Sequence, residues 1–456
     1  MRSSHQRRPR FWGLAGLFLA LTLSAGLAAC GDDDNTTTPT PAVTPAGSSA
    51  AGSPSASATQ AQKLGSLSVL GIWGSDELTN FEAMVKPWQD QTGGKMNFTG
   101  TRNITADLTV KVQGNNPPDV AIPAEIGLFQ QYAKAGKLTP LSACPGLEQT
   151  IKDKYPKAFV DLGTVDGKLY GFFMKADTKA TIWYNPQWFS QNGFKPLDAS
   201  AKFQDLVDLS NLIKAKGLAP WSMGVESAES SGWPGTDWIQ QIILNEAGTD
   251  TYDGIVNGTI KFTDPKMKDA WQKFGQIALG QGMTSQGGAA GINATNFKDS
   301  SFPPFDKPPK AAMVYLGSFA AGFIQTQYPS EKAGTDYDFF TWPGGGVTGS
   351  ANIVYAFNSN PTTCSFLSYL ASANAQKIWV QKGGFTSVNK DVSPSDYPDP
   401  VAKKVADQLL NAKTFRFDLD DAIGGKLQQA EFQGVTQYLQ NPGSLDSILS
   451  NIEAAR

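Results

Sequence analysis

Residues 66–73 read SLSVLGIW, a short apolar run that predicts a buried strand. Gly74 follows, and then Ser75 or Asp76 can cap a helix. The apolar side chains that come next have the spacing of one helix face: Phe81, Met84, Val85 and Trp88. A strand followed directly by an amphipathic helix predicts an α/β unit at the start of the folded chain.

The same alternation continues along the chain. Strands are expected at 96–99 and 119–122, and helices at 105–113 and 127–135. Strands that alternate with helices at this spacing indicate a parallel-type sheet, which binds ligands at the carboxyl ends of its strands.

A second α/β set follows the first. Its expected strands are 170–174, 181–184, 311–316, 338–342 and 353–357. Two apolar helix faces are expected, one formed by Phe203, Leu206, Val207, Leu212 and Ile213, the other by Met267, Ala270, Trp271, Phe274 and Ile277. The C-terminal part is expected to be mostly helical. Because no linker separates the two sets, the chain is predicted to cross between two α/β lobes more than once.

The N-terminus has the composition of a secretory signal peptide over residues 1–29. Residues 2–10 are basic, residues 11–29 are uncharged and apolar, and the run ends in Leu-Ala-Ala before Cys30. A transmembrane anchor is the alternative, because a run of this length could just span a bilayer. The Leu-Ala-Ala-Cys ending resembles the bacterial lipobox, which implies cleavage before Cys30 and lipidation of that cysteine.

Residues 30–63 combine the expected lipidated cysteine with a low-complexity stretch rich in Thr, Pro, Ala, Ser and Gly, which predicts a flexible tether. The folded part is therefore expected outside the cell, lipid-anchored at the outer face of the cytoplasmic membrane. Cys144 and Cys364 could form a disulfide in such an oxidising space, and two buried free thiols are an equal alternative.

Composition excludes several functions. The chain has 456 residues, of which 40% are hydrophobic and 17% charged, so it can build a large core and is not a disordered polyelectrolyte. Its net charge of −3 argues against nucleic-acid binding, which needs clustered Lys and Arg. The single histidine, His5, lies in the expected signal peptide, and only three cysteines are present. Histidine-dependent nucleophiles and zinc sites are therefore excluded, and no metal or cofactor is expected.

Several segments that occur in order along residues 64–456 carry a family resemblance. They are LGIW (70–73) with SDE (75–77), GNNPPDV (114–120), QYAKAGKLTPL (131–141), KLYGFFM (168–174), WYNP (183–186) and AAMVYLGS (311–318). Together they resemble the extracellular solute-binding lipoproteins of carbohydrate ABC transporters, the maltose-binding-like family. The motifs GTR (100–102), YGFFMKAD (170–177), GWPGTDW (232–238) and TFRFD (414–418) are most similar to the α-glucoside-binding members.

The resemblance implies a two-lobed α/β fold of the type II periplasmic-binding-protein kind, with a hinge and a ligand cleft between the lobes. It implies a first lobe of residues 64–175 plus 345–388 and a second lobe of 176–344 plus 389–456. The implied protein is a monomeric receptor, not an enzyme. It captures an α-glucoside such as maltose, trehalose or a maltooligosaccharide and delivers it to ABC permease subunits in the membrane.

A sugar ring has apolar C–H faces and a rim of hydroxyls, so its site needs flat aromatic rings, carboxylates and planar donors. The candidate sugar-binding residues, from their positions and from the family motifs, are Trp73, Arg102, Glu125, Asp177, Trp233, Asp237, Phe319 and Arg416.

Alternatives remain open for several candidates and for the function. Trp73 could pack in the core, Asp237 could favour the positive end of a helix, and Arg416 could pair with Asp418. Phe319 stands where many relatives have a stacking tryptophan. A lipid-anchored extracellular glycoside hydrolase is the alternative function, because such enzymes also combine aromatic rings with carboxylates.

Overall fold

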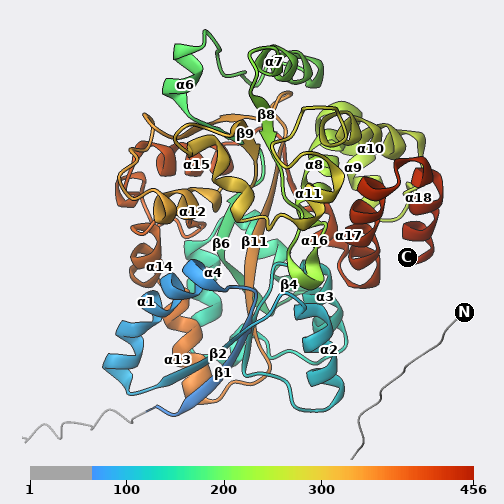
Figure 1. Cartoon of the computed structure of the whole chain (residues 1–456). Coiled ribbons are helices and arrows are strands. Elements are labelled where there is room, and N and C mark those ends of the chain that lie inside the picture. Colours follow the sequence, from blue (N-terminus) through green and yellow to red (C-terminus); the bar gives the residue numbers. More distant parts are fainter. Residues whose placement is uncertain (1–63) are drawn as a thin grey trace, which may run out of the picture. The chain divides into compact units, whose positions relative to one another are not determined.

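The computed structural model describes residues 64–456 (Figure 1). The expected signal peptide, Cys30 and the tether lie outside the described residues. Within residues 64–456, no helix has the length and apolar character that crossing a membrane requires. The described chain forms two separate larger sheets with helices packed on them, and we call the parts built on these sheets the first and second lobes.

The first lobe is built on a seven-stranded sheet with the order β12-β6-β11-β3-β1-β2, in which β13 also pairs with β11. These strands are β1 (Ser66–Gly71), β2 (Lys95–Gly100), β3 (Val120–Ile122), β6 (Gly171–Thr178), β11 (Val347–Ala356), β12 (Thr386–Ser387) and β13 (Phe415–Phe417). As expected, β1 pairs in parallel with β2 and β3. β11 pairs antiparallel with β3 and β6, so the sheet is mixed.

Helices connect and cover this sheet. They are α1 (Ser75–Thr92), α2 (Ile104–Gln113), α3 (Ile126–Lys134), α4 (Leu147–Lys154), α5 (Lys157–Leu162), α13 (Pro361–Leu370) and α14 (Ala373–Val380). α15 (Pro400–Leu410) contacts both lobes, because its Leu409 belongs to the first core and its Lys404 donates to the Phe339 carbonyl of the second lobe. A small hairpin, β4 (Thr164–Val165) with β5 (Lys168–Leu169), precedes β6. α1 buries Phe81, Met84, Val85 and Trp88, the face that the sequence predicts. Its N-cap is Gly74, and neither Ser75 nor Asp76 caps it, so that expectation is wrong.

The second lobe is built on a four-stranded sheet with the order β10-β7-β9-β8. Its strands are β7 (Thr181–Tyr184), β8 (Ala219–Ser222), β9 (Ala311–Tyr315) and β10 (Asp338–Thr341). Its helices are α6 (Pro186–Gln191), α7 (Phe203–Ala215), α8 (Trp233–Ile242), α9 (Thr249–Val256), α10 (Pro265–Ala278), α11 (Ala289–Ala294), α12 (Ala320–Gln327), α16 (Leu419–Ile423), α17 (Gly425–Gln440) and α18 (Leu445–Ala454). In Figure 1, β8 and β9 lie in the upper lobe and β1 and β2 in the lower one.

Each lobe has its own buried core. The second core includes Phe203, Leu206, Val207 and Ile213 of α7, as the apolar spacing predicts. Leu212 is 61% exposed, so its assignment to the same face is wrong. At about 100° per residue, Leu212 points roughly opposite to Phe203, nine residues earlier in the helix, and therefore away from the core.

The chain passes between the lobes at three places, from β6 to β7, from β10 to β11 and from β13 to α16. Gly344 and Gly345 of the second crossing have φ of 96° and 72°, a conformation that favours glycine. Gln241 of α8 and Asn245 of the π-helical turn that follows it, Ile243–Ala247, bind this crossing. Gln241 Nε2 donates to the Gly346 carbonyl at 2.6 Å, and Asn245 Oδ1 accepts from the Gly346 amide at 2.7 Å. The exact residue boundaries of the lobes stay a prediction.

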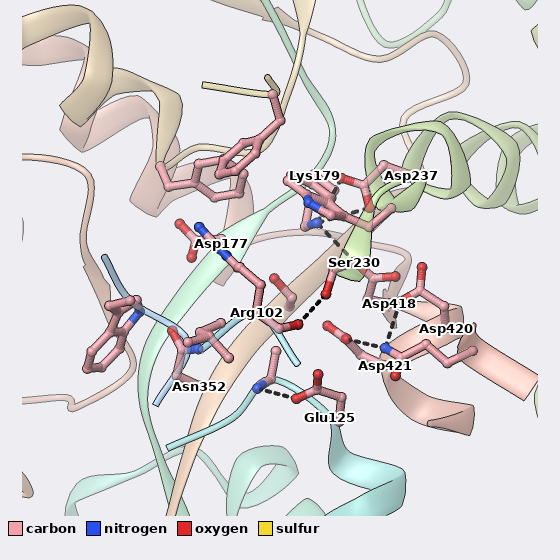
Figure 2. A pocket seen from close by; sticks show the side chains of 18 of the residues that line it. Arg102, Glu125, Asp177, Lys179, Ser230, Asp237, Asn352, Asp418, Asp420 and Asp421 are labelled. Carbon is pink, nitrogen blue, oxygen red and sulfur yellow. Dashed lines mark hydrogen bonds and ion pairs between the residues drawn. The ribbon is translucent and has the colours of Figure 1, made fainter. Parts of the chain in front are cut away.

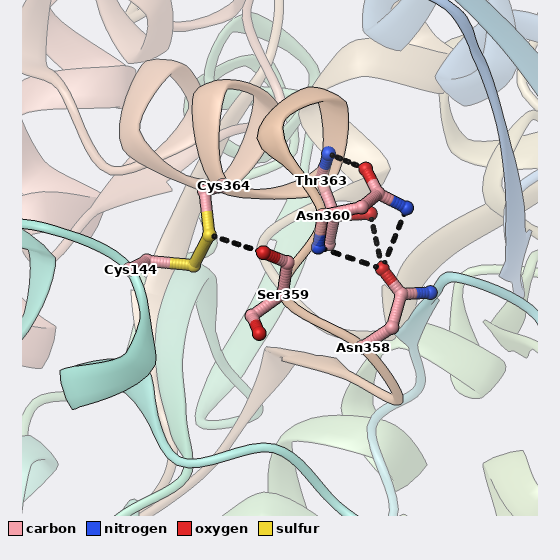
Figure 3. The surroundings of a disulfide bond; sticks show 6 residues. All are labelled: Cys144, Asn358, Ser359, Asn360, Thr363 and Cys364. Atoms are coloured by element: carbon pink, nitrogen blue, oxygen red, sulfur yellow. Dashed lines mark hydrogen bonds between the residues drawn. A yellow bond between two sulfur atoms is a disulfide. The ribbon is translucent and has the colours of Figure 1, made fainter.

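Cys144 and Cys364 form a disulfide in the first lobe (Figure 3). Cys144 follows a short 3₁₀ turn, Leu141–Ala143, and Cys364 lies in the first turn of α13. Of the two alternatives that the sequence leaves open, the structure therefore has the disulfide and not the free thiols. The bond joins positions 220 residues apart.

We predict that the double variant Cys144→Ala/Cys364→Ala loses about 2–4 kcal/mol of unfolding free energy, because a cross-link over a long loop restricts the unfolded chain. Urea denaturation with and without a reducing agent measures this. The reducing agent should destabilise the wild-type protein and leave the variant unchanged. Equal stability of the two oxidised proteins would contradict the prediction.

Candidate functional site

A cavity lies between the two lobes, where strands of both sheets end (Figure 2). All candidate residues from the sequence except Arg416 line it, namely Trp73, Arg102, Glu125, Asp177, Trp233, Asp237 and Phe319. The remaining lining residues are Ile72, Glu77, Ala124, Lys175, Lys179, Ser230, Phe297, Ser350, Asn352, Asp418, Asp420, Asp421, Gln428 and Phe432. The cavity thus combines aromatic rings, carboxylates and cations from distant parts of the chain.

The fold explains how the first lobe supplies its part of the lining. Trp73, Arg102 and Glu125 each follow one of three neighbouring parallel strands, β1, β2 and β3. The carboxyl ends of parallel strands meet at one edge of a sheet, which is where ligands bind in α/β folds. The second lobe faces this edge with Trp233 and Asp237 of α8 and with Phe319, which follows β9.

The aromatic candidates differ in their surroundings. Trp73 is 1% exposed and packs on Phe81 and Trp379, with ring centroids 4.7 and 4.9 Å away, so it belongs to the first core as well as to the cavity wall. Trp233 is only half-buried, and its ring meets Phe297 at 5.1 Å and Phe319 at 6.0 Å. These three rings of the second lobe form an aromatic wall of the cavity.

Arg416 lies away from the cavity lining. Its Nε and Nη2 atoms donate to the two carboxylate oxygens of Asp253 at 2.6 and 2.8 Å, and its side chain is 33% exposed. The alternative partner considered from the sequence, Asp418, pairs with Lys179 instead. Arg416 therefore ties β13 to α9 in the second lobe.

Lys179 is a central residue of the cavity that the sequence did not single out. Its Nζ atom lies 2.7 Å from Asp237 Oδ2, 3.2 Å from Asp418 Oδ2 and 4.6 Å from the centroid of the Trp233 ring. Burial lowers the pKa of Lys179, but attraction by Asp237, Asp418 and Asp421 outweighs it, so the pKa lies above its ordinary value. The sequence does not indicate this role of Lys179, because its partners Asp237 and Asp418 are far from it along the chain.

A second ion pair lies at the first crossing. Lys175 Nζ is 2.5 Å from Asp177 Oδ2 and 3.5 Å from Glu77 Oε1, and all three residues line the cavity. Asp177 Oδ1 also accepts a hydrogen bond of 2.9 Å from the Ser318 hydroxyl. The sequence analysis singles out Asp177 as a candidate but not its ion-pair partner Lys175.

Asp420 and Asp421, at the start of α16, form an acidic wall that the sequence analysis also missed. Thr236 Oγ1 donates to Asp420 Oδ2 at 2.5 Å. Gln428 Nε2 donates to Asp421 Oδ1 at 3.0 Å (Figure 2). Burial and nearby carboxylates, above all Asp418, raise the pKa of both groups well above the ordinary value. A signal existed, since residues 418–421 read DLDD directly after the TFRF motif.

Arg102 and Glu125 keep polar atoms available to the cavity. Among residues 64–456, the Arg102 guanidinium makes no hydrogen bond, and its Cζ atom lies 4.9 Å from the centre of the Phe297 ring. Burial lowers its pKa, while Glu77 and Glu125 oppose this by attraction. Glu125 Oε2 accepts from the Ala124 amide at 3.1 Å, and burial raises the pKa of Glu125.

The acidic side of the cavity could hold a cation. Carboxylate oxygens of Asp237, Asp418 and Asp420 lie within 4.8 Å of one another. However, the Lys179 ammonium already contacts Asp237 and Asp418, so a metal ion there would have to replace it. The residues therefore fit an ammonium better than a metal.

The family follows from a sequence comparison. A profile described as bacterial extracellular solute-binding protein matches residues 83–406, which is more than half of the chain. The chain belongs to this family. Two curated relatives support the assignment. The osmoprotective compounds-binding protein GgtB of Synechocystis sp. is 30% identical, over 85% of this chain and 91% of the relative. The alpha-glucosides-binding periplasmic protein AglE of Rhizobium meliloti is 31% identical, over 83% and 84%.

Solved structures agree on the fold of this solute-binding protein. A chitin oligosaccharide binding protein superimposes with a TM-score of 0.73 at 20% identity, covering 85% of this chain and 97% of that one. RafE in complex with raffinose superimposes with a TM-score of 0.66 at 18% identity, covering 85% and 98%. The predicted two-lobed α/β fold with a cleft between the lobes is therefore confirmed.

Glu431 of α17 is a buried acid behind the cavity. It is 1% exposed, and its Oε2 atom has no hydrogen-bond partner within the described residues. Burial and the nearby Asp418 raise the pKa of Glu431 to about 8. An unfolded chain would ionise this group near its ordinary pKa of about 4.3. Between these two values the folded state holds a proton that the unfolded state has lost, so stability falls as the pH rises.

We predict that the solute-binding protein is more stable at acidic than at mildly alkaline pH, and that Glu431 alone accounts for up to about 3 kcal/mol of the loss between about pH 5 and pH 8. Glu431→Gln should make the pH dependence shallower by that amount, as measured by urea denaturation. Asp446→Asn, which removes a carboxyl that is 79% exposed, is the control. An unchanged pH dependence in Glu431→Gln would contradict the prediction.

Proposed function

We propose that this solute-binding protein is the sugar-binding component of an ABC importer. It captures an α-glucoside such as maltose, trehalose or a maltooligosaccharide between its lobes and delivers it to permease subunits in the membrane. The observation that carries the proposal is the lining of the cavity, where an aromatic wall faces hydrogen-bonding carboxylates and cations. The name of the relative AglE, an alpha-glucosides-binding protein, supports the choice of sugar.

The aromatic wall suits the apolar faces of a sugar ring. Trp233, Phe297 and Phe319 are in mutual contact through Trp233, and all three line the cavity. The C–H groups on the face of a pyranose pack well on such rings. Trp233 is the largest ring of this wall and is only half-buried, so we propose that it covers one face of the sugar.

The polar groups suit the hydroxyl rim. A hydroxyl both donates and accepts, so its site needs acceptors and donors side by side. Glu125, Asp420 and Asp421 supply carboxylate oxygens, and the guanidinium of Arg102 supplies donors that no protein group uses within residues 64–456. Because these groups come from both lobes, a sugar that contacts them stabilises the closed arrangement of the lobes over the open one.

The proposed receptor needs no chemical step. A glycoside hydrolase would need one carboxylic acid that protonates the leaving group and a second carboxylate that acts as nucleophile or base. Capture requires only reversible binding, for which micromolar affinity, or about −8 kcal/mol, is expected. Incubation with maltose, trehalose and a chromogenic glucoside distinguishes the two functions, because products of hydrolysis would overturn the receptor proposal.

We further propose that the protein is a monomer anchored at the outer face of the cytoplasmic membrane through lipidated Cys30. Cys30→Ser should abolish incorporation of a labelled fatty acid, because the thioether to the lipid cannot form. Metabolic labelling of the producing cells measures this. Undiminished label in the variant would refute the lipid anchor.

We predict a saturable change in tryptophan fluorescence with maltose, trehalose or a related α-glucoside, and little response to amino acids. Trp233→Ala should weaken binding by roughly 1–3 kcal/mol, by analogy with other losses of stacking on aromatic rings. Isothermal titration calorimetry of the wild-type protein and the variant measures the difference.

Trp188→Ala is a matched control, because Trp188 is also a half-buried tryptophan of the second lobe but packs on Phe189 and Phe194 outside the cavity. It should bind sugar as the wild type does. A folded Trp233→Ala protein with unchanged affinity would remove Trp233 from the site. A thermal melt shows whether each variant is folded. An unfolded Trp233→Ala protein would indicate that Trp233 is a core residue and not a site residue.

A further inference from the structure

Two neighbouring strands of the first sheet, β6 and β11, contribute four polar side chains to the cavity. Across these strands Ser350 pairs with Asp177, and Asn352 pairs with Lys175. Residues paired across two strands project from the same face of a sheet, as do residues two positions apart along one strand. All four side chains line the cavity, and we call them the polar floor. It presents two ions and two neutral groups to a solute.

The two ions of the polar floor have their partners within the protein. Lys175 Nζ contacts the carboxylates of Asp177 and Glu77. Asp177 Oδ1 also accepts a hydrogen bond from the Ser318 hydroxyl. Separating a buried ion from its partner is costly, so a neutral solute would gain little by replacing these contacts.

The two neutral groups of the polar floor have no such partners. Asn352 is only 4% exposed, yet its amide forms no hydrogen bond with any residue of the chain from 64 to 456, and Figure 2 draws no interaction to it. The Ser350 hydroxyl forms none with these residues either. Buried amides are nearly always hydrogen-bonded, because an unpaired one costs free energy. An unpaired amide in the wall of a cavity therefore indicates a partner from outside the chain.

The backbone places Asn352 at the centre of the first lobe's contribution to the cavity. Between Asn352 and Ile353 the pairing of β11 with β6 shifts, so that the register skips Met174 of β6. Such bulges are common next to functional sites, where they change the direction of a side chain. The Ile353 amide donates to the Pro123 carbonyl at 2.9 Å, just before the loop that carries Glu125. Since β11 lies between β6 and β3, Asn352 lies between the ion pair and this loop.

We infer that Asn352 is a solute-binding residue whose amide binds two neighbouring hydroxyls of the sugar, with the Ser350 hydroxyl as a further partner. A side-chain amide has an acceptor oxygen and two N–H donors in one plane. Of two hydroxyls on adjacent ring carbons, one can donate to the oxygen while the other accepts from the nitrogen. The ligand class of the subsite is therefore a neutral vicinal diol. The inference rests on the proposed function, because it specifies hydroxyl contacts of the sugar in the same cavity.

Variants of Asn352 test the contact. Maltose and trehalose are titrated into the wild-type protein by calorimetry, and the sugar that binds more tightly is used with the variants. Asn352→Leu removes the amide and nearly keeps its size, and Asn352→Ala removes it without adding a bulky group. Each should weaken binding by roughly 10-fold or more, because hydrogen bonds to the sugar are lost.

Asn97→Leu is the matched control. Asn97 is an asparagine in β2 of the same sheet, but it is exposed and does not line the cavity. This variant should bind the sugar as the wild type does. Thermal melts show whether each variant is folded.

Analogues of the chosen disaccharide that each lack one hydroxyl distinguish a hydroxyl contact from a change in the shape of the cavity. Two analogues, with hydroxyls missing from adjacent carbons, should bind the wild-type protein roughly 5-fold or more weaker than the parent sugar. In Asn352→Leu and Asn352→Ala the same analogues should bind nearly as well as the parent sugar, because the partner of the missing hydroxyl is already absent. Such non-additivity is expected only of groups in direct contact.

Two kinds of result would contradict this subsite. Wild-type affinity in both folded Asn352 variants would overturn the inference and leave the sugar receptor intact. The same would follow if every analogue lost affinity by equal factors in wild type and variants, or if both variants failed to fold, since Asn352 would then be a structural residue. If neither disaccharide bound the wild-type protein, the proposed function would be overturned together with the inference.

Discussion

The buried ion pair of Lys179 with Asp237 and Asp418 is the interaction on which the cavity depends. It joins the β6–β7 crossing, the first turns of α8 and the segment that follows β13. Removing a charge from water costs several kcal/mol unless a partner of opposite sign compensates it. Without Lys179, Asp237 and Asp418 would face each other uncompensated, next to Asp420 and Asp421. The Lys179 ammonium therefore offsets the negative charge of the acids around it.

The same helix that carries Asp237 also reaches the hinge. α8 begins at Trp233, in the cavity, and a π-helical turn, Ile243–Ala247, extends it to the second crossing. There Gln241 and Asn245 bind Gly346, and Gln241 Oε1 also accepts from the Thr348 amide at 3.1 Å. α8 and its π-helical turn thus connect this crossing to Trp233. A rotation of the lobes about the crossing therefore moves the aromatic wall with it.

Local patterns in the sequence predict most of the fold. The strands that contain Ile182 and Met313 are single apolar runs, and the structure has them within one or two residues of their expected ends. The cavity positions of Trp73, Arg102 and Glu125 could also be predicted, because each follows a parallel strand. Lys179 could not, since its role depends on partners that only the folded chain brings close, whereas the DLDD run at 418–421 could have indicated Asp420 and Asp421. Arg416 has the right motif, but it pairs with Asp253 and does not line the cavity.

The disulfide has a consequence for chain continuity. The strands of the second sheet, from Thr181 to Thr341, all lie between Cys144 and Cys364 in sequence, so the bond closes a covalent ring that contains them (Figure 3). A protease that cuts one loop of the second lobe between Cys144 and Cys364 would therefore open the ring without releasing a fragment. The nicked protein would keep both pieces in one molecule and would separate into two bands only on a reducing gel. Outside a cell, where proteases are common and reductants scarce, a single cut in that lobe need not detach it from the first.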